Sequence, residues 1–181
     1  MSRIISGRFR GRKLIAPGKL DLRPTTDRAK EALFNILRSR VDFEQIRVLD
    51  LFAGIGNISL EMASRGAEDV TAVEINPKAA AFIESKAEEL GLDNFRILKT
   101  DALRFLKSSY EKWGLIFADP PYAYSEHRQL VDTVFQRGLL EKHGLLIVEH
   151  GEEVDLSDHA FYRESRKYSR LIFSFFHEDA S

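Results

Sequence analysis

The sequence predicts an α/β fold with a mostly parallel sheet that is covered by helices on both faces. Short apolar runs alternate with helix-like segments between residues 47 and 149, which is the pattern of right-handed βαβ units. The chain has 181 residues, of which 44% are hydrophobic and 30% are charged. This composition is typical of one globular domain with a sizeable core.

The first 39 residues are expected to form an extended arm followed by a helix. Two short strands are predicted, Arg3–Ser6 and Arg12–Ala16, with two glycines spaced as in a hairpin. Residues 17–26 contain two prolines and a glycine, which mark a loop. A helix is predicted over about 27–39, because its apolar residues lie on one face and N-cap residues precede it.

The rest of the chain alternates strands with helices. The predicted strands are Arg47–Phe52, Asp69–Glu74, Phe95–Thr100, Leu115–Ala118 and Gly144–Glu149. The predicted helices are Asn57–Arg65, Pro77–Leu90, Ala102–Ser108 and His127–Gln136. Phe161–Tyr168 and Arg170–Phe176 are expected to form an antiparallel pair. Since ligands of open parallel sheets bind outside the carboxyl ends of the strands, the residues after each strand are the candidate site.

Several classes of protein are excluded or disfavoured by what the sequence lacks. It contains no cysteine, which excludes disulfides, thiolate metal sites and a cysteine nucleophile. No apolar run approaches the roughly 20 residues of a membrane span. The first seven residues contain no secretory apolar region. We therefore expect a cytoplasmic protein that does not contact membranes.

A glycine loop after the first parallel strand is the first candidate binding element. Gly54 and Gly56 follow the run ending at Phe52, and glycine lets a backbone turn tightly beside a ligand. The dinucleotide fingerprint requires glycine or alanine three residues later, where this chain has Ser59. A nicotinamide site is therefore disfavoured without being excluded, and a tight turn that only joins strand to helix is the structural alternative.

Two acidic residues follow the next two strands. Glu74 lies twenty positions after Gly54, where a carboxylate can accept hydrogen bonds from a ribose diol. Asp101 can accept from an adenine amino group. Each also has a structural alternative, since Glu74 can cap the helix at Pro77 and Asp101 the helix at Ala102. Together they favour a cofactor that contains adenosine.

The most specific signal is Asp119–Tyr122, which reads Asp-Pro-Pro-Tyr and follows the apolar run Leu115–Ala118. An exocyclic amine on a base is a poor nucleophile because its lone pair is conjugated with the ring. The Asp119 carboxylate and the Pro120 carbonyl can accept its two hydrogens and direct the lone pair at a methyl donor. Tyr122 can stack on the base. This chemistry requires no metal; a proline-rich loop with a structural aspartate is the alternative.

With these motifs the chain resembles class I S-adenosylmethionine-dependent methyltransferases. More narrowly, it is similar to the bacterial family that methylates guanine N2 in small-subunit (16S) ribosomal RNA. The resemblance covers nearly the whole chain, and the Arg-Pro-Thr-Thr-Asp stretch is its most family-specific part. The matching segments are Arg3–Gly7, Gly11–Leu14, Leu22–Asp27, Glu31–Asn35, Leu49–Gly54, Ser64–Ala67 and Asp119–Tyr122.

The resemblance implies a Rossmann-like seven-stranded sheet, S-adenosylmethionine as the methyl donor and an RNA guanine as the acceptor. The implied catalytic residues are Asp119, Pro120 and Tyr122. The implied cofactor residues are Asp50, Phe52, Ala53, Gly54, Gly56, Glu74, Ile75, Asp101 and Ala102. Two segments depart from the family pattern: the glycine loop with Ser59, and the stretch Tyr168–Phe173, where a turn containing glycine is more usual.

The charge along the chain indicates an RNA partner. Residues 1–30 contain nine basic and two acidic residues, a net charge of +7, whereas the whole chain has −1. RNA binding is favoured over a merely solvated basic surface, because this segment precedes a base-modifying motif. We predict a basic arm over 1–26 and a methyltransferase domain over 27–181. The expected RNA-contacting residues are Arg3, Arg8, Arg10, Arg12, Lys13, Arg23, Thr25, Thr26 and Arg28.

Three alternatives stay open at this stage. A DNA adenine-N6 methyltransferase would use the same tetrad, although no target-recognition domain is visible. A protein glutamine methyltransferase usually has asparagine in place of Asp119. A non-catalytic RNA-binding assembly factor would not need the intact tetrad, glycines and Glu74. The preferred expectation is a monomer that acts on ribosomal RNA in an assembling small subunit.

Overall fold

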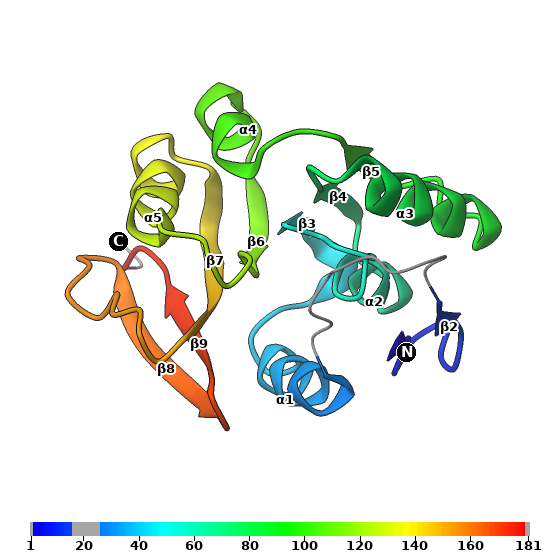
Figure 1. Cartoon of the computed structure of the whole chain (residues 1–181), viewed down its shortest axis with the longest axis horizontal. Helices are drawn as coiled ribbons and strands as arrows, with labels where there is room; N and C mark the ends of the chain where they lie inside the picture. Colours follow the sequence, from blue (N-terminus) through cyan, green and yellow to red (C-terminus); the bar gives the residue numbers. More distant parts are fainter. Residues whose placement is uncertain (1, 16–25, 180–181) are drawn as a thin grey trace.

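Strands and helices alternate along the chain in the computed structural model, which describes residues 2–15 and 26–179 (Figure 1). The strands are β1 (Ser2–Arg3), β2 (Lys13–Leu14), β3 (Arg47–Leu51), β4 (Asp69–Val73), β5 (Phe95–Leu98), β6 (Trp113–Ala118), β7 (Leu140–Gly151), β8 (Tyr162–Tyr168) and β9 (Leu171–Phe176). The helices are α1 (Asp27–Leu37), α2 (Ser59–Ser64), α3 (Pro77–Glu89), α4 (Ala102–Ser108) and α5 (His127–Gln136), with one 3-10 turn, η1 (Phe43–Gln45).

The central sheet has seven strands in the order β5-β4-β3-β6-β7-β9-β8. Each pair from β5 to β7 is parallel, and β9 pairs antiparallel with both β7 and β8. A separate antiparallel pair, β1 with β2, forms the short N-terminal hairpin. The predicted fold class, a mostly parallel seven-stranded α/β sheet with an N-terminal hairpin, is confirmed.

Helices cover both faces of the sheet (Figure 1). Val48 of β3 packs in a core cluster with residues of α1 and α2, whereas Leu49 packs in a second cluster with residues of α4 and α5. Because successive side chains of a strand point to opposite faces, the two helix groups lie on opposite sides. Ile83 of α3 packs on Ala72, on the same side as α1 and α2.

Two details at the C-terminal end differ from the expected pattern. The predicted strand Gly144–Glu149 is longer in the structure, because β7 begins at Leu140, which pairs with Trp113. Residues 141–143 are polar, so the apolar pattern that predicts the strand begins only after them. In the β8–β9 turn, Ser169 has a φ of 60°. This left-handed conformation favours glycine, so Ser169 occupies the kind of position at which the resemblance implies a glycine-containing turn.

The N-terminal hairpin packs along α2. Gly7 has a φ of +81°, and a Cβ on it would lie 1.8 Å from the carbonyl oxygen of Ser64. The amide of Arg8 donates to that carbonyl at 2.8 Å, and the amide of Phe9 donates to the Ser64 hydroxyl at 2.9 Å. The turn of the hairpin therefore covers the C-terminal end of α2, and only glycine fits at its closest approach.

A buried ion pair fixes the hairpin to both α1 and α2. The side chains of Lys30 and Glu61 are 0% exposed, and Lys30 Nζ lies 3.4 Å from Glu61 Oε2. Lys30 Nζ also donates to the carbonyl of Arg3 and, at 2.8 Å, to Asn57 Oδ1, while Glu61 accepts hydrogen bonds from two hairpin amides. Burial lowers the pKa of Lys30, and the Glu61 charge opposes this effect. Lys30 therefore has a structural role, although it lies in the basic segment.

Lys30→Met should destabilise the protein by about 3 kcal/mol, because it leaves a buried carboxylate without its cation. The loss falls at the lower end of the usual range, because Arg65 still pairs with Glu61 at 2.9 Å. Urea unfolding measures the change, with Lys13→Met as the control, since Lys13 is an exposed hairpin lysine. A Lys30→Met loss as small as that of the control would contradict a structural ion pair.

Candidate active site

The carboxyl ends of β3, β4, β5 and β6 lie in one row, and β7 continues past this row to Gly151. Leu51 of β3 pairs with Val73 of β4 on one side and with Ala118 of β6 on the other. Val73 pairs with Leu98 of β5, and Ala118 pairs with Val148 of β7. The residues that follow these strands therefore meet at one edge of the sheet, where ligands of such folds bind.

The glycine loop after β3 leaves space on one side and packs tightly on the other. Gly54 has a φ of +58°, and a Cβ built on it meets no atom within 4 Å. Gly56 has a φ of +80°, and its Cβ would lie 3.0 Å from Leu60 and 3.1 Å from Ile83. Phe52 also adopts a positive φ, 62°, which is uncommon for a bulky residue and is found at functional sites.

Glu74 holds the glycine loop against the end of β4. Its side chain is buried, and its two carboxylate oxygens accept hydrogen bonds from the amides of Gly54 and Asn76, both at 2.7 Å. Each oxygen keeps a further lone pair that can accept from a hydroxyl. Ile75, next in the chain, is 67% exposed and presents apolar surface at the same edge.

Asp101 caps α4, which is the structural role that the sequence offered as the alternative to ligand binding. Its Oδ1 accepts a hydrogen bond from the amide of Arg104 at 2.8 Å, while the residue as a whole is exposed. Ala102 behind it is buried. Capping occupies one oxygen of Asp101 and leaves the other available, so the cap does not prevent it from contacting a ligand.

Asp50 lies beneath the glycine loop. It is 2% exposed, and its Oδ2 accepts a hydrogen bond at 3.0 Å from the amide of Ser59, the first residue of α2. Burial, together with the nearby charges of Asp119 and Glu74, raises the pKa of Asp50 to about 8. The carboxyl group thus positions the start of α2, and its contact with a cofactor stays a prediction.

The Asp-Pro-Pro-Tyr segment follows β6 at the same edge. Asp119 is half-buried, Pro120 is buried, and Tyr122 is 76% exposed. The amide of Tyr124 donates to the carbonyl of Pro121 at 2.8 Å, which closes a turn after the tetrad. A small pocket opens beside these residues, and its opposite wall comes from the end of β7 and the start of β9.

A row of rings joins the glycine loop to this pocket. The rings of Phe52 and Tyr124 meet edge to face with centroids 5.1 Å apart, and those of Tyr124 and His127 lie 5.2 Å apart. His150 follows at 6.4 Å from His127. Burial raises the pKa of Tyr124 to about 12. Sequence reasoning missed these three residues; their only signal was that two of them follow Asp119 closely.

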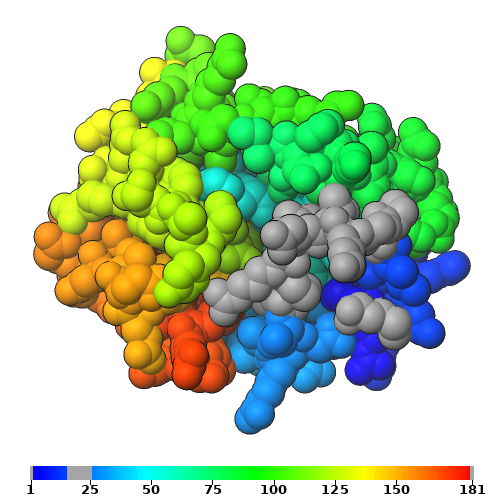
Figure 2. All heavy atoms as spheres, in the orientation of Figure 1, coloured from blue at the N-terminus to red at the C-terminus, as the bar shows by residue number. Residues whose placement is uncertain are grey.

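The predicted RNA-contacting residues divide into three groups. Arg3, Arg8, Arg10, Arg12, Lys13 and Arg28 are exposed. Thr26 is the N-cap of α1, with its hydroxyl accepting from the amide of Ala29 at 3.2 Å. Arg23 and Thr25 lie outside the described residues. The hairpin (blue) and the segment between β6 and α5 (yellow-green) lie on the same face of the molecule (Figure 2).

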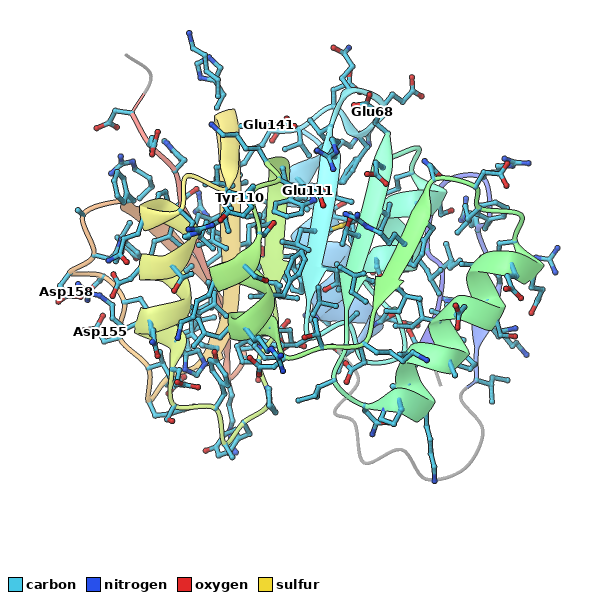
Figure 3. The ribbon with its side chains drawn as sticks, turned by 90° about the horizontal axis from the view of Figure 1, so that it is seen from above. Glu68, Tyr110, Glu111, Glu141, Asp155 and Asp158 are labelled. Atoms are coloured by element: carbon cyan, nitrogen blue, oxygen red, sulfur yellow. The ribbon has the colours of Figure 1, made fainter. Side chains whose placement is uncertain are left out.

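The opposite edge of the sheet has a different character. Glu68, Glu111 and Glu141 lie toward the amino ends of different strands (Figure 3), where Glu111 pairs with Arg47 and Arg96. In the part of the chain that the structure describes, no three His, Asp or Glu side chains are grouped to hold a metal ion. Within the same ranges, no helix has the length and apolarity needed to cross a membrane.

Asp50→Asn should flatten the dependence of stability on pH. A raised pKa in the folded state means that folding takes up a proton between the ordinary value, 3.8, and about 8, so wild-type stability falls as pH rises through this window. Asparagine does not titrate, so the free energy of unfolding of the variant should rise relative to that of wild type by up to about 1.4 kcal/mol for each pH unit. Urea unfolding at several pH values from 5 to 8 tests this.

The matched control is Asp101→Asn, because Asp101 is exposed. Its stability curve should run parallel to that of wild type over the same pH range. A parallel curve for Asp50→Asn would show that Asp50 is already ionised at pH 5.

Comparison with known proteins adds relatives that share this architecture. The chain is 35% identical over 147 residues to ribosomal RNA small subunit methyltransferase D of Escherichia coli (strain K12), covering 81% of this chain and 73% of that protein. It is 33% identical over 151 residues to the protein of the same name from Haemophilus influenzae, covering 81% and 77%. The structure of a hypothetical protein, TTHA0928, from Thermus thermophilus superimposes with a TM-score of 0.85 at 30% identity, covering 98% of this chain and all of that one.

One family profile spans almost the entire sequence. It is described as conserved hypothetical protein 95, and it matches residues 2–177. The match includes the hairpin, the glycine loop and the Asp-Pro-Pro-Tyr segment, so it covers every part of the candidate site. The chain therefore belongs to the conserved hypothetical protein 95 family, and the two relatives above are named ribosomal RNA methyltransferases.

Proposed function

We propose that this protein transfers a methyl group from S-adenosylmethionine to the exocyclic N2 of a guanine in small-subunit ribosomal RNA. The observation that carries the proposal is the position of Asp119–Tyr122, which follows β6 in the same row as the glycine loop and Glu74. An amine-binding tetrad and a nucleoside-binding edge therefore adjoin. Two relatives named small subunit methyltransferase D support ribosomal RNA as substrate, and the family resemblance supports guanine N2.

The residues at the ends of β3, β4 and β5 fit S-adenosylmethionine. This cofactor, when bound, supplies an electrophilic methyl group on a sulfonium. The free side of Gly54 leaves room for it, and the Glu74 carboxylate can accept hydrogen bonds from ribose hydroxyls. The exposed side chain of Ile75 can cover one face of a purine, and Asp101 can accept from its amino group. Phe52, Ala53, Gly56 and Ala102 would line the same site.

The tetrad would activate the amine. The Asp119 carboxylate and the Pro120 carbonyl accept its two hydrogens, which turns its lone pair out of conjugation with the ring. Pro120 and Pro121 stiffen the backbone, so that these acceptors are held in place before the base arrives. Tyr122 is exposed enough to stack on the base once the base has left its own helix.

The exposed arginines of the hairpin would hold the RNA backbone. Five of the predicted RNA-contacting cations lie on the hairpin, on the same face as the tetrad (Figure 2). At the other ends of the strands, Arg47 and Arg96 both pair with Glu111 (Figure 3), so these two cations are less available to phosphate than those of the hairpin. RNA would therefore approach from the tetrad side. The proposal includes an assembling small subunit in the cytoplasm as the substrate and a monomer as the active form.

Two measurements test the assignment. Nucleoside mass spectrometry of small-subunit RNA should show less N2-methylguanosine in a strain lacking the protein, and it maps the modified position. Methyl transfer from tritiated S-adenosylmethionine should label that RNA, and neither DNA nor protein. Labelling of DNA or of protein glutamine alone would replace the proposal with one of those activities, and no labelling at all would favour a non-catalytic assembly factor.

Asp119→Ala should lower kcat by at least about 100-fold, because it removes an acceptor needed in the transition state. Cofactor affinity should change little, since Asp119 belongs to the amine side of the site. Calorimetric titration with S-adenosylmethionine separates the two effects, with Asp158→Ala as a surface control. If Asp119→Ala instead abolishes cofactor binding, the role given to Asp119 is wrong.

The double variant Arg8→Ala/Arg10→Ala should weaken RNA binding and reduce its salt dependence. Each lost phosphate contact lowers the slope of log affinity against log salt by about 0.7–0.9. This slope is measured by titrating the protein with ribosomal RNA fragments at salt concentrations between about 50 and 200 mM, a range over which phosphate contacts make affinity fall strongly. Lys142→Ala, at the amino ends of the strands, should keep the wild-type slope. An equal change in both variants would contradict a hairpin-specific RNA contact.

A further inference from the structure

A second carboxylate lies beside Asp119. Ala118 of β6 pairs with Val148 of β7, so the next residues, Asp119 and Glu149, occupy neighbouring positions on adjacent parallel strands. Such strands lie about 4.8 Å apart. Glu149 is only 5% exposed, and it lines the same small pocket as Asp119 and Tyr122. The proposed reaction gives Glu149 no role.

The edges of the two purines differ next to the exocyclic amine. Guanine carries an N1–H donor beside its N2 amine, so two neighbouring groups both donate. Adenine carries an N1 acceptor beside its N6 amine, which would place a lone pair against any acceptor there. Two adjacent carboxylates therefore match guanine and oppose adenine, and hydrogen bonds to a charged group are the stronger kind.

The other groups of the pocket are less suited to this contact. Both ring nitrogens of His150 already have partners, Ser174 Oγ at 2.7 Å and the carbonyl of Gly151 at 2.8 Å. Glu153 and Arg170 are exposed at the mouth of the pocket. Glu149 is the buried carboxylate that adjoins the amine acceptor.

We propose that Glu149 accepts the N1–H of the target guanine and so selects guanine over adenine in the active site. This inference rests on the proposed function, because it assumes that the amine held by Asp119 is guanine N2. In this arrangement, Asp119 holds the reacting amine while Glu149 determines which base can present it.

The test compares two bases at the modified position of small-subunit RNA, guanine and 2-aminopurine. 2-Aminopurine keeps the 2-amino group but lacks both the N1–H and the 6-oxo group of guanine. The contribution of Glu149 is therefore the change in base preference between wild type and a Glu149 variant, since the loss of the 6-oxo group affects both proteins. For wild type, kcat/KM should be about 10- to 100-fold higher with guanine than with 2-aminopurine, which is the effect expected of one hydrogen bond to a charged group. Glu149→Gln should reduce this preference to about 3-fold or less, because its amide N–H can donate to the bare N1 of 2-aminopurine.

The ratio of two substrates in one protein does not depend on how much of a variant is folded. Glu152→Gln is the matched control, since Glu152 is exposed, pairs with Lys167 and lies outside the pocket lining. It should keep the wild-type ratio. If wild type methylates guanine and Glu149→Gln keeps the same ratio, the assignment of Glu149 is overturned while the proposed function stands. If wild type does not methylate guanine in RNA, the proposed function fails and the inference fails with it.

Discussion

The register of the parallel strands is the constraint on which the candidate site depends. Hydrogen bonds between β3, β4, β5, β6 and β7 set their register, so that β3, β4, β5 and β6 stop in one row beside Val148 of β7. A slip of one residue in any pair would turn the following side chain to the other face of the sheet. Glu74, Asp101, Asp119 and Glu149 come together because the backbone pairing places them there.

Burial of the sheet on both faces explains why this edge could be found from the sequence. A parallel strand covered on both sides consists of apolar residues, so the first polar residue after it marks its end. Glu74 and Asp119 directly follow such runs, whereas Asp101 comes after Lys99 and Thr100 at the end of the half-buried strand β5. The places of all three in the row were predicted. The start of β7 was not predicted, because polar residues at 141–143 conceal it. Glu149 was included in a predicted strand and therefore had no chemical assignment.

Side-chain orientation was the part that the sequence could not provide. Tyr124 and His127 join the glycine loop to the pocket because they pack against Phe52 and His150, which are distant in the chain. The basic segment shows the same limit. Lys30 resembles its neighbouring cations in the sequence, yet it is buried because Glu61, on another helix, lies within ion-pair distance. The sequence shows which side chains are charged, whereas tertiary contacts determine whether a charged side chain is exposed to solvent or buried.

The contact of Gly7 with Ser64 has a consequence for the order of folding. The hairpin is synthesised before α2, because its partners on α2 lie 55 to 58 residues later in the chain. Closing so long a loop is slow compared with forming a local turn, and it cannot begin until α2 has left the ribosome. The hairpin therefore reaches its final place only after α2 has been made, and until then it remains a cationic segment without its partner.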